Sequence, residues 1–332
     1  MSGNGLGRSI VLNDYDAEYR RVAAVLMDYG GIVAPVMLGG EWQALLTLTD
    51  EVLKSPPTDD QGRREVERKF DELVGNPAFH PNYRAHLTSR ATTLPHLSRC
   101  SHLVERAVLH YYKGDFLSCV LVLLPAVEGT LRSYMGLAES DPSINWKQVR
   151  DALQAGTPET HPQRRAMYAD ALSAFHERWF WARTSTADFS LSYLNRHYAL
   201  HAIGTGSYYR ATDCHRLFLY FDTFADMLML EGHGPKHVFL PESPEVRRRR
   251  DYYFSLLLHP PSLPIVQKVE AQLLAEHPNF VPEERPPSVS EMFSRFARVM
   301  GMADPPARRK RDGLRGLYSR LLARLISKPR RP

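Results

Sequence analysis

The order of hydrophobic and polar positions along the chain predicts a mostly helical protein. Apolar residues recur with the period of an α-helix in eight segments, separated by turn-forming Gly, Pro and Asp residues. Residues 31–38 fit a short strand or a buried loop, and residues 76–95, with three prolines, fit an irregular connection. We therefore assign the chain to the all-α class. The expected helices cover residues 14–29, 41–54, 60–74, 96–113, 115–137, 145–155, 162–183 and 207–230. Two further short helices are expected, one opened by Arg247–Arg250 and one at 262–276.

Three of these helices differ in which faces are apolar. Residues 115–137 are apolar on nearly every side before Glu128, which predicts a buried helix, and Pro125 should bend it because proline removes a backbone donor. The 207–230 helix has a wide apolar face, so we expect one side to pack within its domain and the rest against a second copy. The 60–74 segment is heavily charged, which is typical of a solvated face.

The composition changes after Glu231, because ten of the 24 prolines lie between Pro235 and Pro287. We place a domain boundary near residues 232–246. Three regions follow from it: an additional N-terminal helical region of unknown role at 1–95, a central helical domain at 96–232, and a Pro-rich linker with C-terminal helices and a basic helical tail at 233–332.

Cysteine usage and hydropathy predict a cytoplasmic protein. The three cysteines (Cys100, Cys119 and Cys214) form no CxxC pair and fit buried free thiols in a reducing compartment. Residues 1–8 lack the apolar run of a signal peptide, and the longest apolar stretch, 119–127, is too short for a membrane span.

The basic character of the chain belongs to its last residues. Residues 305–332 contain ten Lys or Arg and one Asp, whereas the whole chain has a net charge of only +5, so the remainder is net acidic. Apolar residues between Leu314 and Ile326 recur at i, i+3 and i+4, which predicts a basic amphipathic helix. Such a helix fits RNA, a protein partner, an anionic membrane contacted through residues 311–328, or packing on its own domain with solvated arginines. The basic residues available for contact are Arg308, Arg309, Lys310, Arg311, Arg315, Arg320 and Arg324.

Residues 195–201 hold the most informative polar cluster, Asn-Arg-His-Tyr-Ala-Leu-His. Arg196 supplies a permanent forked cation suited to phosphate, and His201 can give or take a proton near neutral pH. Cleavage of RNA needs little more, because its own 2′-hydroxyl is the nucleophile. The Arg-x4-His spacing is not selective by itself. Arg210 and His215 also match it, and we interpret that pair as lying at the surface or at an interface.

The context of the first match carries a resemblance to a known family. The segment resembles the RNase motif of the HEPN superfamily, in which Arg and a polar residue, here His197, precede His by a few positions. Residues 116–132 look like the "LLPxxEGxLR" helix of bacterial HEPN-like proteins, and residues 211–225 are similar to the helix that closes those domains. The resemblance covers about residues 96–232. The family often has Gly directly after the motif His, where this chain has Ala202.

This resemblance implies a HEPN-like helical bundle and a metal-independent endoribonuclease that needs no cofactor. Its composite active site would lie where the motifs of two identical subunits face each other. Arg196 would hold the scissile phosphate and His201 would move the proton, whereas His197 would orient RNA or a partner and Asn195 would bond the phosphate or the backbone. The implied partners are RNA and a second copy. Related enzymes serve in toxin–antitoxin and antiviral defence systems, so an antitoxin or other protein is a further partner.

Helix geometry and residue chemistry leave alternatives for the motif. Five residues of regular helix place Arg196 and His201 about 140° apart, so sharing a face requires a departure from helical backbone. His197 and His201 have the i, i+4 spacing of two zinc ligands, but no HExxH motif and no nearby Cys accompany them. Purely structural histidines are another interpretation. The rival function is a non-catalytic HEPN-like module that binds a nucleotide, RNA or a protein.

Two further polar groups are open to interpretation. Glu128 ends the apolar part of the 115–137 helix, where a buried unpaired carboxylate is unfavourable, so we expect it to position Arg196. A pair with Arg132 at i+4, or simple exposure at the helix end, is the alternative. We assign the second group, His96, His102 and His110, to one helix face rather than to a ligand set, because they lie at helical spacing.

Overall fold

The computed structural model describes residues 9–33, 41–138, 144–180, 194, 210–234 and 242–258. Every regular element in these ranges is a helix, so the predicted all-α class is confirmed for the described part of the chain. Two elements, η1 and η3, are single π-helical turns, and η2 is a 3₁₀ turn. The elements in chain order are α1 Ser9–Met27, α2 Glu41–Lys54, α3 Asp60–Phe70, η1 Asp71–Gly75, α4 Asn76–Ala78, α5 Pro81–Thr93, η2 Ser98–Cys100, α6 Ser101–Tyr112, α7 Phe116–Tyr134, α8 Trp146–Ala155, α9 Pro162–Phe175, η3 His176–Phe180, α11 Ala211–Leu230 and α12 Pro244–Leu258.

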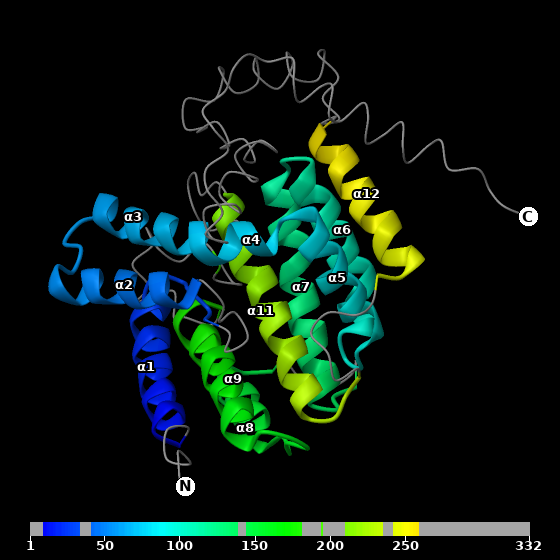
Figure 1. The fold of residues 1–332 in the computed structure, drawn as a ribbon. Coiled ribbons are helices and arrows are strands. Elements are labelled where there is room, and N and C mark those ends of the chain that lie inside the picture. Colours follow the sequence, from blue (N-terminus) through cyan, green and yellow to red (C-terminus); the bar gives the residue numbers. More distant parts are fainter. Residues whose placement is uncertain are drawn as a thin grey trace, which may run out of the picture.

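Helix α11 lies in the middle of the arrangement (Figure 1). It packs against α7 on one flank and α9 on the other, and α4, α5 and η1 also contact it. Helix α6 pairs with α7, and α12 lies on α5 and α6. On the opposite side α1 packs on α9, and α2 contacts both α1 and α3. Buried apolar side chains from all these helices form one continuous core, which extends from Tyr19 in α1 to Leu256 in α12.

Local sequence signals set several helix ends. Asp59 caps α3, because its carboxylate accepts a hydrogen bond of 2.7 Å from the Gly62 N–H. Gly30 adopts a φ of +75° after α1, a left-handed conformation that favours glycine. This turn lets the Gly31 N–H reach back to the Leu26 carbonyl at 2.9 Å, which closes the helix as the sequence predicted.

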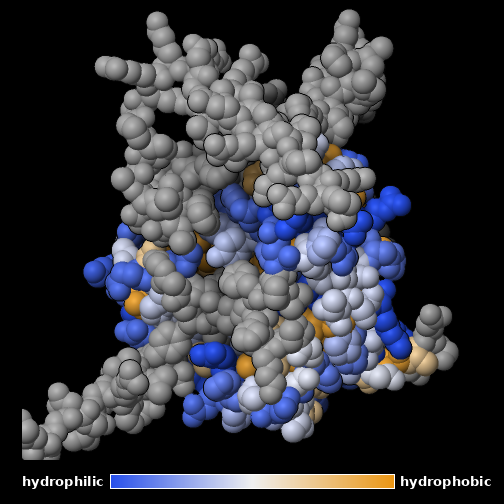
Figure 2. Space-filling view, turned by 45° about the vertical axis from the view of Figure 1, so that its right-hand side comes forward, coloured by the Kyte–Doolittle hydropathy of each residue, from blue (hydrophilic) through white to orange (hydrophobic). Residues whose placement is uncertain are grey.

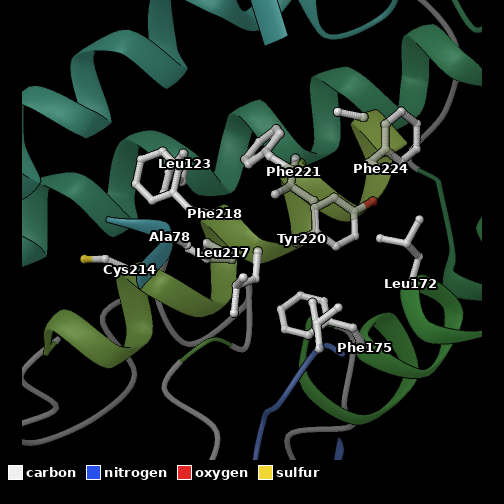
Figure 3. Close-up of a cluster of buried hydrophobic side chains, with 14 of the residues drawn as sticks. Ala78, Leu123, Leu172, Phe175, Cys214, Leu217, Phe218, Tyr220, Phe221 and Phe224 are labelled. Carbon is white, nitrogen blue, oxygen red and sulfur yellow. The ribbon is translucent and has the colours of Figure 1, made fainter. Parts of the chain in front are cut away.

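Aromatic side chains fill the space between α11 and its two flanking helices (Figure 3). Phe218 of α11 lies beside Leu123 of α7, and Tyr220 lies toward α9. There the Tyr220 ring is 5.6 Å from the Phe175 ring, centroid to centroid, and Leu172 packs nearby. These side chains are fully buried, so α11 contributes apolar surface to both halves of the core.

The segment predicted as an irregular connection is instead largely helical. Helix α5 begins at Pro81 and short α4 has Pro77 near its start, positions where proline is tolerated because the first helical N–H groups have no partner within the helix. The third proline follows the end of α5. The prolines therefore separate helices here rather than prevent them.

Helix α3 has the expected solvated face, with Arg64, Glu65 and Arg68 exposed, while Val66, Glu67 and Phe70 are buried on its other side. The expectation for α11 is wrong. In α11, residues 213–228 are all buried by the rest of the chain. The predicted free apolar side of this helix, which was to meet a second copy, is therefore occupied within the chain itself.

Helix α7 is the one helix of the described chain that is long and apolar enough to cross a membrane by length and composition. Half of its apolar window is buried within the molecule, and core helices of soluble proteins pass the same test. Its outer side exposes Leu117 and Leu121. On the face seen in Figure 2, hydrophobic residues outside the grey atoms lie interspersed among hydrophilic ones.

Candidate functional site

Two described residues, Leu194 and Arg210, flank the motif in sequence. The four motif residues (Asn195, Arg196, His197 and His201) and the basic tail lie outside the described residues. Leu194, one position before the motif, is fully buried and belongs to the hydrophobic core. Arg210, nine positions after His201, is the N-cap residue of α11. Leu194 and Arg210 are therefore the described residues nearest to the motif on its two sides, one in the core and one at the start of α11.

Arg210 is held by a network of charges at the start of α11. Its backbone N–H donates to the Asp213 carboxylate at 2.9 Å, and its guanidinium lies 3.3 Å from Glu67 of α3. Glu67 is buried and also pairs with Arg216 at 3.0 Å, while Arg216 contacts Asp213 at 3.2 Å. These pairs join α3 to the amino end of α11 and hold Arg210, the first described residue after the motif.

A groove of about 830 Å³ lies beside this point, between α3 and the first turn of α11. Two of its arginines are engaged, since Arg68 pairs with Glu65 at 2.6 Å and Arg210 pairs with Glu67. Arg64 is exposed and forms no ion pair with any residue that the structure describes. The described residues that line the groove are Asp59, Gln61, Gly62, Arg64, Glu65, Glu67, Arg68, Arg210 and Thr212.

Glu128 lies on α7 and is partly exposed. It follows Leu121 and Pro125 on the outer side of the helix, at spacings of seven and three residues, and α7 packs directly on α11. Its carboxylate is therefore not locked in the apolar core. The predicted contact with Arg196 involves a residue outside the described ranges.

In the second Arg-x4-His match, Arg210 is partly exposed, but the surface or interface interpretation is wrong for His215. The His215 side chain is buried, and its two ring nitrogens are both engaged, Nδ1 with the Asp71 carboxylate at 2.6 Å and Nε2 with the Tyr111 hydroxyl at 2.7 Å. Asp71 begins the π-turn η1, which closes at Gly75. A Cβ at Gly75 would collide with Asp71 and with His215, so this packing requires glycine there. The arrangement holds η1 against α11.

The other histidines also take structural positions. His96 lies outside α6, in a left-handed conformation with φ of +65°, and its Nδ1 is 3.1 Å from the Ser133 hydroxyl. It therefore does not share one helix face with His102 and His110, contrary to the prediction. His176 is buried against the Tyr220 hydroxyl at 2.8 Å, and burial lowers its pKa to about 3. This imidazole is neutral at physiological pH.

Sequence analysis missed the buried ion pairs between α5 and α11. Arg84 donates two hydrogen bonds to Asp222, at 2.9 and 2.8 Å, and Arg90 pairs with Asp226 one turn later. All four side chains are buried. The available signal was the presence of carboxylates on an otherwise apolar helix, because a buried charge needs a partner. The arginine partners of these carboxylates lie more than 130 positions away in sequence, so local spacing could not identify them.

All three cysteines of the chain lie among the described residues. All three cysteines are buried and free, as predicted. Within those ranges, no group of three or more His, Cys, Asp or Glu side chains is arranged to hold a metal ion. Comparison of the whole chain with models of known protein families, with curated proteins and with solved structures finds no match.

Proposed function

We propose that this chain is a metal-independent endoribonuclease of the HEPN type, with Arg196 and His201 as its catalytic residues. The proposal starts from the motif at 195–201 and its resemblance to the HEPN RNase motif. The observation that carries it furthest is the attachment of the motif segment, since Leu194 is buried in the core and Arg210 is fixed by its charge network. A catalytic pair needs such fixed ends, because proton transfer depends on position within fractions of an ångström.

Two further observations support an RNA substrate. The groove beside Arg210 is large enough for several atoms of a nucleotide chain, and exposed Arg64, which pairs with no residue that the structure describes, supplies a cation there for phosphate. Glu128 is partly exposed on α7, where a carboxylate can orient a guanidinium without the desolvation that a fully buried position imposes.

The proposed reaction uses only groups of the protein and the RNA. One imidazole removes the proton from the 2′-hydroxyl, whose oxygen attacks the adjacent phosphorus. The bond to the 5′-oxygen breaks, and a second imidazole returns a proton to that leaving oxygen. Arg196 stabilises the charge that builds on the phosphate, and two facing copies of His201 in a homodimer supply the base and the acid. The products are a 2′,3′-cyclic phosphate and a 5′-hydroxyl.

The test is RNA cleavage in EDTA by the wild type, Arg196→Ala and His201→Ala, with detection of the cyclic phosphate. We expect each substitution to reduce the rate by at least about 100-fold, which is typical for loss of a general acid–base or an oxyanion-stabilising group. Matched controls are Arg106→Ala and His102→Ala on the exposed side of α6, which should cleave like the wild type. Unchanged cleavage by both motif variants would disprove the assignment. RNA binding without any wild-type cleavage would favour the non-catalytic module.

The biological role proposed from the same resemblance is that of a defence or toxin effector controlled by an antitoxin or another protein. In this proposal the basic tail, residues 308–324 in particular, localises the enzyme on RNA, a membrane or a partner. Deleting residues 305–332 should then leave cleavage of a short RNA intact and reduce that localisation.

A further inference from the structure

Two partly exposed histidines face each other at the carboxyl end of α11. His96 lies in the loop between α5 and η2, and His233 lies in the turn that follows α11. Their rings are 6.1 Å apart, centroid to centroid, and stand nearly perpendicular, at 89°. The contact therefore joins two segments that are distant in sequence. It is independent of the ribonuclease proposal, because neither histidine belongs to the motif.

Both segments hold backbone conformations that depend on their contacts. His96 has a φ of +65°, which is uncommon for a residue with a Cβ. Gly232 and Gly234, on either side of His233, have φ values of +83° and +92°. A Cβ at Gly234 would collide with the Leu94 side chain, so this turn packs directly on the loop that carries His96. A strained loop of this kind keeps its conformation only while the surrounding contacts hold it.

Hydrogen bonds and ring packing set the position of each histidine. The Nδ1 atom of His96 is 3.1 Å from the Ser133 hydroxyl, and its ring lies 5.5 Å from the Tyr134 ring at the end of α7. The backbone N–H of His233 donates to the Leu228 carbonyl at 3.0 Å. The pair is therefore fixed from α7 on one side and from the last turn of α11 on the other.

The surroundings of His96 disfavour its protonated form. Burial lowers the pKa of this imidazole, and the nearby His233 and Arg99 lower the same pKa further because they place positive charge beside it. The hydrogen bond with Ser133 and the charge of Glu231 act in the opposite direction, but the pKa stays below its ordinary value. Protonation of both histidines would thus bring two like charges together beside an arginine.

The carboxylate of Glu231 is already engaged and does not neutralise the pair. It accepts hydrogen bonds from Arg165 at 2.5 and 2.8 Å and from the Tyr134 hydroxyl at 2.8 Å. Tyr134 is the titratable group that α7 brings to His96. Burial and, next, its hydrogen bond to Glu231 raise the pKa of Tyr134 to about 12, so it stays neutral while the histidines titrate.

From this geometry we infer that the contact between His96 and His233 is a pH-sensitive switch, which holds the turn after α11 on the α5–η2 loop when the imidazoles are neutral and releases it when both are protonated. An imidazole has an ordinary pKa near 6.5 in the released form and a lower pKa in the closed form. The closed form is therefore favoured above about pH 6.5 and is lost progressively as the pH falls below that value. Two unit charges about 6 Å apart in partly solvated surroundings shift such an equilibrium by about tenfold.

The first experiment is hydrogen exchange of the full-length protein at pH 7 and pH 5, with rates corrected for the intrinsic effect of pH. Protection of residues 94–98 and 231–234 should fall about tenfold at pH 5, beyond any change in the middle of α11, which reports global unfolding. His233→Gln and His96→Gln should each abolish this difference. His102→Gln, exposed on α6, is the matched control and should behave like the wild type. Equal local protection at both pH values in the wild type would overturn the inference.

The second experiment distinguishes charge coupling from a purely structural role of His233. The titration of the His96 ring is followed by NMR in the wild type and in His233→Gln. Removing the like charge should raise the pKa of His96, and added salt should reduce the difference between the two proteins. An unchanged or lower pKa of His96 in His233→Gln would contradict the switch, even if the variant alters local protection.

Discussion

The ion pair between Arg84 and Asp222 offers a quantitative test of how the N-terminal helices are held on α11. The two side chains are 1% and 8% exposed and share two hydrogen bonds of 2.9 and 2.8 Å. Removing one member leaves the other buried without a counter-charge, which costs about 3–5 kcal/mol. For a domain of this size, about 2–4 °C in Tm corresponds to each kcal/mol, so Asp222→Leu should lower Tm by roughly 6–20 °C.

A double-mutant cycle separates the charge from the shape of the side chains. Arg84→Met alone should destabilise the protein about as strongly as Asp222→Leu alone. The combined variant should be more stable than either single variant, because replacing both charges by apolar groups of similar size removes the uncompensated charge. The free energy of unfolding is measured by urea denaturation followed by circular dichroism, with Tm as an independent readout.

An exposed pair provides the matched control for this cycle. Arg21 and Asp50 are joined at 2.7 Å, but their side chains are 43% and 47% exposed. The same Met and Leu substitutions there should reveal a coupling below about 1 kcal/mol, because water screens the charges. A coupling energy for Arg84 and Asp222 as small as that of the control pair would refute the argument that burial makes this contact strong.

Two other predictions concern α11 and its neighbours. Burial lowers the pKa of His176 to about 3, so below about pH 6.5 the unfolded chain binds a proton that the folded chain does not. The free energy of unfolding should therefore fall by about 2 kcal/mol between pH 6.5 and pH 5. Denaturation curves of His176→Gln should lack this loss, and an equal loss in the variant would contradict the assignment. Gly75→Ala introduces a Cβ against Asp71 and His215, so it should destabilise the fold by about 1–3 kcal/mol, measured as a lower urea midpoint. Ser55→Ala in the exposed turn after α2 is its control, and an equal shift in both variants would exclude the steric explanation.

Local patterns predicted the helices well where the signal itself was local. The boundaries of α2 and α8 lie within a residue of the expected segments, because the apolar period and the flanking turn residues are contiguous in sequence, and Asn145 caps α8. The pair α6 and α7 was also expected, since Gly114 and Asp115 separate two strong helical patterns. Helix α5 was missed because its prolines were counted as helix breakers without regard to their position at helix starts.

The remaining differences arise from contacts between distant segments. The apolar face of α11 predicted that this face is buried. It did not predict that Asp213, Asp222 and Asp226 are buried too, because their arginine partners come from α11 itself and from α5. His215 looked like a surface residue for the same reason, because its partners come from η1 and α6. Glu128 falls within the described residues, whereas Arg196 and His201 lie outside them. The assignment of Arg196 and His201 therefore stays a prediction.

The ion pairs of α5 also have a consequence for how the chain is made. Arg84 leaves the ribosome 138 residues before Asp222, an interval of about 7–28 s at typical rates of synthesis. Throughout this time α5 carries two arginines that the finished protein buries, and their carboxylate partners do not yet exist. Helix α5 therefore cannot settle into its final position during translation of the first half of the chain. We expect the nascent protein to complete its core only after α11 has emerged, so that folding of the N-terminal helices waits for a helix encoded near residue 220.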